Sequence, residues 1–181
     1  MKKVCISFLA GLGGLLLVGG AMADDNLFTQ GYVGVSYYQL EQDDRFFGDS
    51  RFDTGELFVR VVGNINEYFS SELRLGATVA DNTDSGIEFR HNYLVTGLLR
   101  AGWPLGPVTP YLAVGHTWGE ERWEFSGTAQ RATFNDWSYG AGIDMDLGER
   151  LGVSLEMIQH YENLNGNVSL RGAGLGAYWR F

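Results

Sequence analysis

Long stretches of this sequence alternate between apolar and polar residues, and this pattern constrains the fold more than any other feature. The clearest stretch runs from Gly55 to Asn64, where Leu57, Val59 and Val61 alternate with Glu56, Phe58 and Arg60. Successive side chains of a β-strand point to opposite faces, whereas an amphipathic helix repeats about every 3.6 residues. The segment is therefore predicted to be a strand with one apolar and one charged face.

The same alternation recurs along the chain. It is clear in residues 72–79, 87–101, 137–145, 151–157 and 168–181, and weaker in 30–40 and 109–118. The connections alternate between short ones, at 64–68, 103–108 and 146–150, and longer polar ones, at 41–52, 80–86, 119–133 and 162–167. This arrangement predicts an all-β fold, an eight-stranded antiparallel up-and-down transmembrane β-barrel.

A soluble barrel would show the same alternation with its apolar residues pointing inward. The membrane alternative is favoured because the strands approach the ~9 to 11 residues needed to cross a bilayer. Aromatic residues also fall near the predicted strand ends, where such rings sit at membrane interfaces. They are Tyr37, Phe69, Trp103, Trp118, Trp137, Tyr161, Trp179 and Phe181.

The first residues predict the compartment. Lys2 and Lys3 precede an apolar, glycine-rich run, and Ala21-Met22-Ala23 has the A-x-A form of a signal-peptidase site. We expect residues 1–23 to be a cleaved signal peptide and residues 24–181 to be one outer-membrane barrel domain, with nothing after the last strand. A retained anchor helix is the alternative, but the run falls short of the ~20 apolar residues that a spanning helix needs.

Lysine and cysteine are confined to this predicted signal peptide. Cys5 is the single cysteine, so disulfides, thiol catalysis and cysteine-based metal sites are excluded from the mature chain. Loss of Lys2 and Lys3 takes the formal net charge from −9 to −11, which argues against nucleic acid as a partner. The remaining basic side chains are arginines, which hold their charge when desolvated and suit a buried charge network.

The polar strand faces are predicted to point into the barrel with nearly balanced charges. The residues expected there are Glu56, Arg60, Glu72, Arg74, Glu88, Arg90, Arg100, Asp144, Glu156 and Arg171. An eight-stranded barrel is about wide enough for side chains to fill. We therefore expect these charges to pair across the lumen and close it, with a narrow passive channel as the alternative.

The carboxyl end resembles a known family, the OmpA/OmpX-type outer-membrane β-barrel domain. Gly176, Trp179 and Phe181 match the family's upstream glycine, alternating apolar residue and terminal aromatic residue, while Gly174 replaces a usual polar residue. The resemblance covers essentially residues 24–181. It implies insertion by the barrel-assembly machinery, which reads this end. We further expect a monomer that contacts outer-membrane lipid and lipopolysaccharide and has a structural or surface-contact role in the envelope.

One histidine invites comparison with an enzyme. The outer-membrane lipid A deacylases are similar barrels that use Ser, His and Glu, with His and Ser two residues apart on one strand. Here the residue two after His160 is Glu162, and Ser154 has the wrong spacing. His91 and His116 are predicted on outward faces near strand ends, without ligand-like spacing. We therefore predict no catalytic, cofactor-binding or metal-binding residue and no cofactor, with a lipid A-modifying enzyme as the alternative.

Aromatic residues also gather around the predicted connection 119–133. Trp118, Trp123, Phe125 and Phe134 are the residues concerned. Exposed aromatic side chains commonly anchor interfaces, so they could form a recognition surface, or they could fold over the barrel mouth.

Overall fold

A computed structural model of the protein describes residues 31–44, 50–80, 83–84, 87–125, 128–162 and 168–181. Within these ranges the side chains of 42–44, 50–52, 83–84, 87–89, 123–125, 128–129, 161–162 and 168 are not described. The predicted signal peptide and the connection 163–167 lie outside the described residues. No helix in the described ranges is long and apolar enough to cross a membrane.

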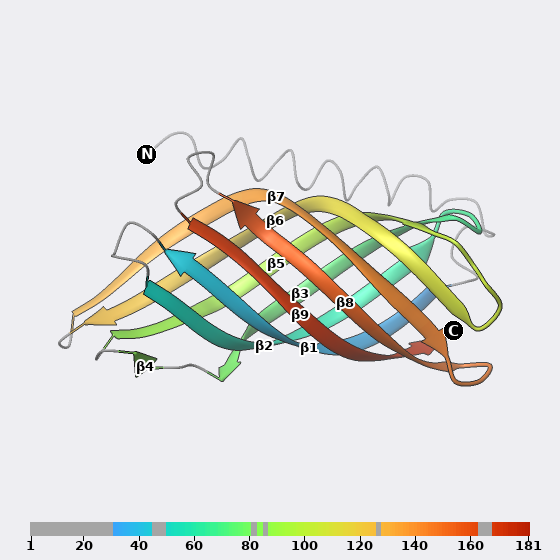
Figure 1. The fold of residues 1–181 in the computed structure, drawn as a ribbon, viewed down its shortest axis with the longest axis horizontal. Helices are drawn as coiled ribbons and strands as arrows, with labels where there is room; N and C mark the ends of the chain where they lie inside the picture. The colour runs from blue at the N-terminus through green and yellow to red at the C-terminus, as the bar shows by residue number, and fades with distance from the viewer. Residues whose placement is uncertain (1–30, 45–49, 81–82, 85–86, 126–127, 163–167) are drawn as a thin grey trace.

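The described chain is built from β-strands. They are β1 (Gly31–Asp44), β2 (Ser50–Asn64), β3 (Phe69–Ala80), β4 (Thr83–Asp84), β5 (Ile87–Gly102), β6 (Val108–Phe125), β7 (Thr128–Asp146), β8 (Leu151–Glu162) and β9 (Val168–Arg180). Each long strand pairs antiparallel with its neighbours, and Figure 1 shows them tilted around a common axis.

Two pairings close the sheet into a barrel. β1 pairs with β9, from Tyr32↔Arg180 to Asp44↔Val168, and β3 pairs with β5, from Phe69↔Ala101 to Gly76↔Leu94. β4 is a two-residue addition at the edge of β5. The predicted eight-stranded antiparallel barrel is therefore confirmed, with β4 as an extra short strand outside the closed ring.

The two ends of the barrel differ. At one end, the turn end, β1 begins, β9 ends and short turns join β2 to β3, β5 to β6 and β7 to β8. In the turn between β2 and β3, the Asn66 side chain accepts hydrogen bonds from the backbone amides of Tyr68 and Phe69, both at 2.8 Å. Gly106 has a φ of 70°, a conformation that glycine adopts at no steric cost. The opposite end is called the distal end.

The outward face is apolar, as the alternation predicts. Leu57, Val59 and Val61 are almost half exposed, whereas Phe58 between them is fully buried. The predicted interface aromatics Tyr37, Phe69, Trp103, Trp137, Trp179 and Phe181 are also exposed. Trp118 is half-buried beside His116, and the side chain of Tyr161 lies outside those described.

The strands at the distal end are longer than predicted. The segment 119–133, expected to be a loop, belongs largely to β6 and β7, which pair as far as Phe125↔Thr128. The segment 41–52 likewise extends β1 and β2 as far as Asp44↔Ser50. The prediction was wrong because polar residues such as Glu120 and Thr133 mark where the apolar band ends, while the backbone ladder continues.

Candidate functional site

The barrel interior holds a connected set of charged side chains. Seven of the residues predicted in the lumen are buried there: Glu56, Arg60, Glu72, Arg74, Arg100, Asp144 and Glu156. They come from five strands, β2, β3, β5, β7 and β8, and tyrosines of β1 and β6 complete their hydrogen bonds. The lumen is therefore a site built by residues far apart in the sequence.

Glu72 is the centre of this set. Its Oε1 accepts hydrogen bonds from Arg60 Nε and Arg74 Nε, both at 2.6 Å. Its Oε2 lies 3.4 Å from Arg100 Nη1. Arg60 and Arg74 face each other on the paired strands β2 and β3, so the carboxylate of Glu72 offsets the repulsion between neighbouring guanidinium groups.

Glu156 binds Arg74 across the lumen. Arg74 Nη1 donates to Oε1 at 2.5 Å and Nη2 donates to Oε2 at 2.6 Å, which is a bidentate pair. Tyr38 donates to Oε1 at 3.1 Å, and Tyr111 donates to Oε2 at 2.5 Å. Both oxygens of the buried carboxylate are thus hydrogen-bonded, as a desolvated charge requires.

A second group lies nearer the turn end. Arg100 Nη2 donates to Asp144 Oδ2 at 2.6 Å, and Tyr32 donates to the same oxygen at 3.0 Å. Arg100 also donates to the Tyr32 hydroxyl. Its guanidinium stacks on the ring of Tyr111, 3.6 Å from the centroid, which adds a cation–π contact to the ion pair.

Small inward residues make room for Arg60. Its Nη1 donates to Ser154 at 2.9 Å and lies 3.3 Å from Ser36. A side chain at Gly176 would come within 2.3 Å of the Ser36 hydroxyl and 2.6 Å of the Ser154 hydroxyl. Sequence analysis did not single out Ser36 or the inward position of Gly176. The signal that could have identified them is the small size of serine and glycine on the strand face that carries the charges.

An apolar layer lies beyond the charges toward the distal end. It consists of Leu40, Phe58, Leu94, Ile158 and Leu170, all buried, from β1, β2, β5, β8 and β9. Sequence analysis did not anticipate this layer, because these residues sit on strand faces that otherwise read as polar. The interior therefore contains both charge pairs and a packed layer of apolar side chains.

His91 lies inside the barrel, so its predicted outward position is wrong. Its Nδ1 is 2.9 Å from Glu56 Oε1, and Thr78 donates to the same oxygen at 2.6 Å. The amide of His91 donates to Thr78 Oγ1 at 2.8 Å. A β-bulge between His91 and Tyr93 shifts the alternation by one residue and brings His91 inward.

The same bulge accounts for a correction at Arg90, which was predicted in the lumen. Arg90 pairs in register with Arg122, while the adjacent pair, His91 and Glu121, is buried. Arg90 is therefore half-buried on the opposite face from the lumen. Glu88, also predicted in the lumen, has a side chain outside those described.

Arg171 is a further correction, because it is exposed and not in the lumen. It lies two residues from Ala173, so both share the outward face of β9. Its Nη2 lies 3.1 Å from Glu41 Oε1 on the adjacent strand, with 57% of the side chain exposed. This is a surface pair beyond the apolar band.

His160 is buried among hydroxyl groups. Its Nδ1 is 3.1 Å from Thr117 Oγ1, and its carbonyl accepts from Ser138 Oγ at 2.8 Å. The ring stacks on Phe58 with centroids 5.8 Å apart. Ser154, the serine considered from the sequence, donates no hydrogen bond to His160 in the structure and instead accepts one from Arg60.

His116 lies in the middle of β6, between Trp118 and Trp137, and not near a strand end.

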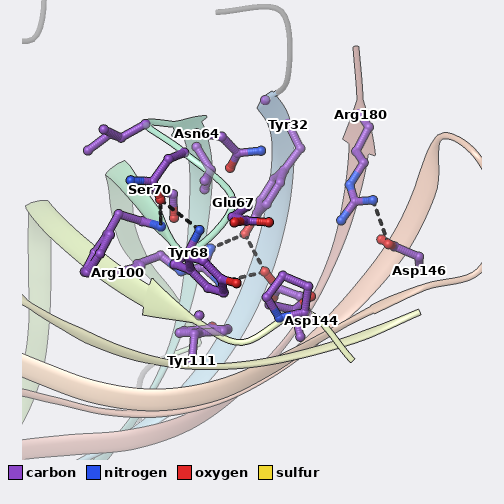
Figure 2. A pocket seen from close by; sticks show the side chains of 18 of the residues that line it. Tyr32, Asn64, Glu67, Tyr68, Ser70, Arg100, Tyr111, Asp144, Asp146 and Arg180 are labelled. Atoms are coloured by element: carbon purple, nitrogen blue, oxygen red, sulfur yellow. Dashed lines mark hydrogen bonds and ion pairs between the residues drawn. The ribbon is translucent and has the colours of Figure 1, made fainter. Parts of the chain in front are cut away.

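The turn end opens into a hollow of about 1060 Å³. In Figure 2, dashed lines join Tyr32 and Arg100 to Asp144 inside this hollow, whose lining also includes the turn residues Asn64, Glu67 and Tyr68. Arg180 pairs with Asp146 at 2.6 Å on its wall. The hollow therefore ends on the charge pairs that fill the lumen.

The residues predicted to direct assembly lie on different faces. Gly176 points inward, Trp179 is exposed on the outer face, and Phe181 is exposed just past the end of β9.

In the described ranges, no group of three or more His, Asp or Glu side chains is arranged to hold a metal ion.

Comparison with known proteins decides the family. The model of the outer membrane protein beta-barrel domain matches residues 10–181. The chain belongs to this family. No curated protein matches the sequence. The protein is thus a transmembrane β-barrel of the outer membrane, and the exposed apolar band of its strands contacts lipid.

Solved outer-membrane barrels share the fold at low sequence identity. Neisserial surface protein A matches with a TM-score of 0.70 at 13% identity, covering 83% of this chain and 97% of that one. Ail, the attachment invasion locus protein of Yersinia pestis, matches at 0.65 and 13% identity, covering 85% and 99%. The N-terminal barrel of Pseudomonas aeruginosa OprF matches at 0.59 and 15% identity, covering 83% and 99%. In such barrels the short turns face the periplasm, which places the turn end there and the distal end outside.

Proposed function

We propose that this protein is a closed, non-conducting monomeric barrel that acts through its external surface, with a structural or surface-contact role in the envelope. The observation that carries this proposal is the charge network. Seven strands, β1, β2, β3, β5, β6, β7 and β8, contribute hydrogen-bonding side chains to it. Paired side chains occupy the lumen, and the apolar layer beyond them leaves the exterior as the surface for contacts.

The similar structures support a contact role. One of them is named for attachment and invasion, and it has also been solved in complex with the heparin analogue sucrose octasulfate, at a TM-score of 0.64 and 16% identity. We extend only the contact role to this chain. The proposal includes insertion by the barrel-assembly machinery and the absence of catalysis, since His160 is fully buried beside Thr117 and Ser138.

Planar-bilayer recordings test the closed lumen. The native protein is expected to give small and infrequent conductance steps, because paired side chains fill the interior. Arg74→Ala together with Glu156→Ala removes a bidentate pair without leaving an unpaired charge on either side, and should raise the frequency of openings. Large, steady channels from the native protein would show that the lumen is an aqueous pore and that the proposal is wrong.

A further inference from the structure

The hollow at the turn end has two buried side chains that are only partly hydrogen-bonded. Arg100 and Asp144 are the lining residues of β5 and β7 that lie farthest from the turns, and they are here called the floor of the hollow. Their side chains are 4% and 6% exposed. Among the described residues, Arg100 Nε and Asp144 Oδ1 have no hydrogen-bond partner. Because buried polar atoms are unfavourable without a partner, the floor offers one donor and one acceptor to a molecule that enters.

The charges of the hollow favour a ligand without charge. Its described lining contains four side-chain carboxylates and three guanidinium groups, so an anion would meet an excess of negative charge. A cation that approached Asp144 would meet the Arg100 guanidinium, which lies 2.6 Å from the same carboxylate. A hydroxyl group is uncharged and both donates and accepts. Hydroxyl groups can therefore bond Asp144 Oδ1 and Arg100 Nε without upsetting the charge balance of the floor.

Tyr68 adds an aromatic face to the hollow. It is about half exposed, and Figure 2 includes it among the side chains that line the hollow. Its backbone is fixed on both sides, since its amide donates to Asn66 Oδ1 at 2.8 Å and its carbonyl accepts the Gly102 amide at 2.7 Å. The face of an aromatic ring is negative and attracts the weakly positive C–H groups of a sugar ring. Tyr68 is thus a fixed platform on which such a ring can pack.

The size and the remaining lining of the hollow fit the same class of ligand. Sites for small molecules commonly have volumes of ~300 to 1000 Å³, and this hollow, at about 1060 Å³, can hold two sugar rings. Asn64, Ser70 and Thr109 also line it. Their amide and hydroxyl groups both donate and accept hydrogen bonds, which suits a ligand with many hydroxyl groups.

We propose that the hollow binds a neutral sugar of one or two rings from the periplasm. Its hydroxyl groups bond Asp144 Oδ1 and Arg100 Nε, and one ring face packs on Tyr68. The site opens at the end of the barrel opposite to the external surface, so it goes beyond the proposed function and does not rest on it. Because the hollow is open to solvent, the dissociation constant is expected to be on the order of 1 mM.

Calorimetric titration of the protein with cellobiose tests the proposal. The protein is held in micelles of a detergent without a sugar head group, since such a head group would compete. Tyr68→Ala removes the platform and should raise the dissociation constant by roughly fivefold or more, whereas Tyr68→Phe keeps the ring and should bind within about twofold of the native protein. Tyr93→Ala is the matched control, because Tyr93 is similarly exposed on the outer face of the barrel, and it should bind like the native protein.

Nuclear magnetic resonance of the unmodified protein examines the floor directly. The signal of the Arg100 Nε–H group should move when cellobiose is added. The signal of the Arg60 Nε–H group should stay in place, because that group already donates to Glu72 at 2.6 Å. A parallel titration with N,N′-diacetylchitobiose distinguishes the source of the sugar. Tighter binding of this probe assigns the site to glycans of amino sugars, and tighter binding of cellobiose assigns it to glucose-type sugars; either result supports the proposal.

Three results would overturn the proposal. The first is the absence of saturable binding of both disaccharides to the native protein. The second is equal binding by the native and Tyr68→Ala proteins, or an Arg100 Nε–H signal that does not move. The third is binding seen only in a variant that begins at Gly31, which would show that the residues before Gly31 occupy the hollow in the native protein.

Discussion

Arg74 and Glu156 form a bidentate ion pair across the barrel lumen, with both side chains fully or almost fully buried and both N–O distances at 2.6 Å or less. They lie on β3 and β8, which are not neighbours in the barrel wall. The pair therefore connects opposite sides of the barrel, and its loss should lower the free energy of unfolding of the whole barrel.

Replacing Arg74 with alanine should destabilise the barrel strongly. The change leaves Glu156 buried without its cation, which costs on the order of 3 to 5 kcal/mol for a dry pair and less if water enters. The free energy of unfolding is measured by denaturant titration of the compact form on gels. Arg131→Ala, at a 63% exposed arginine, is the control and should change stability by less than about 0.5 kcal/mol. Equal losses for the two variants would contradict a structural role for the network.

Gly174 and Ala173 offer a matched pair of substitutions on one strand. Gly174 is buried, and a Cβ there would lie 2.4 Å from the Tyr38 ring, whereas Ala173 is exposed on the outer face. Gly174→Val should cost about 1 to 3 kcal/mol through overpacking. Ala173→Val should be nearly neutral. The midpoint of thermal unfolding is measured for both variants. An unchanged midpoint for Gly174→Val would show that the Tyr38 ring can move aside without loss of stability.

Deleting Phe181 should lower the yield of membrane-inserted protein, if the barrel-assembly machinery reads the terminal aromatic residue. Phe181 is 61% exposed and its amide donates to the Gly31 carbonyl at 3.2 Å, so its deletion should change the stability of the folded barrel only slightly. Leu147→Ala is the control, because Leu147 is similarly exposed at the same end of the barrel. Quantitative blots of outer-membrane fractions measure the yield. Normal accumulation of the truncated protein would refute the assembly role.

Lipid A should remain intact when incubated with the purified protein. The reason is that His160 and its hydroxyl partners are buried, with Ser138 Oγ bonded to the His160 carbonyl and not to its ring. Mass spectrometry of the lipid before and after incubation measures the acyl chains. Deacylation by the native protein that His160→Ala abolishes would show that the protein is an enzyme.

The strand faces could be predicted from the sequence because alternation is a local property. Leu57 and Val59 point outward and Arg60 inward for the same reason that any strand alternates. The reasoning failed at His91 and Arg90, where a single bulge reverses the faces. An inserted residue changes no composition and leaves no pattern that distinguishes it from a continuing strand. Polarity likewise could not locate the end of β6, because polar residues pair in a ladder as well as apolar ones do.

The sequence by itself determined the class of fold, the number of long strands and the face of most buried charges. Only the tertiary structure decided that Arg74 meets Glu156, which are 82 residues apart, and that Glu72 joins three arginines. Such partners depend on the stagger between strands and on how the sheet closes, because these set the height at which each side chain enters the lumen.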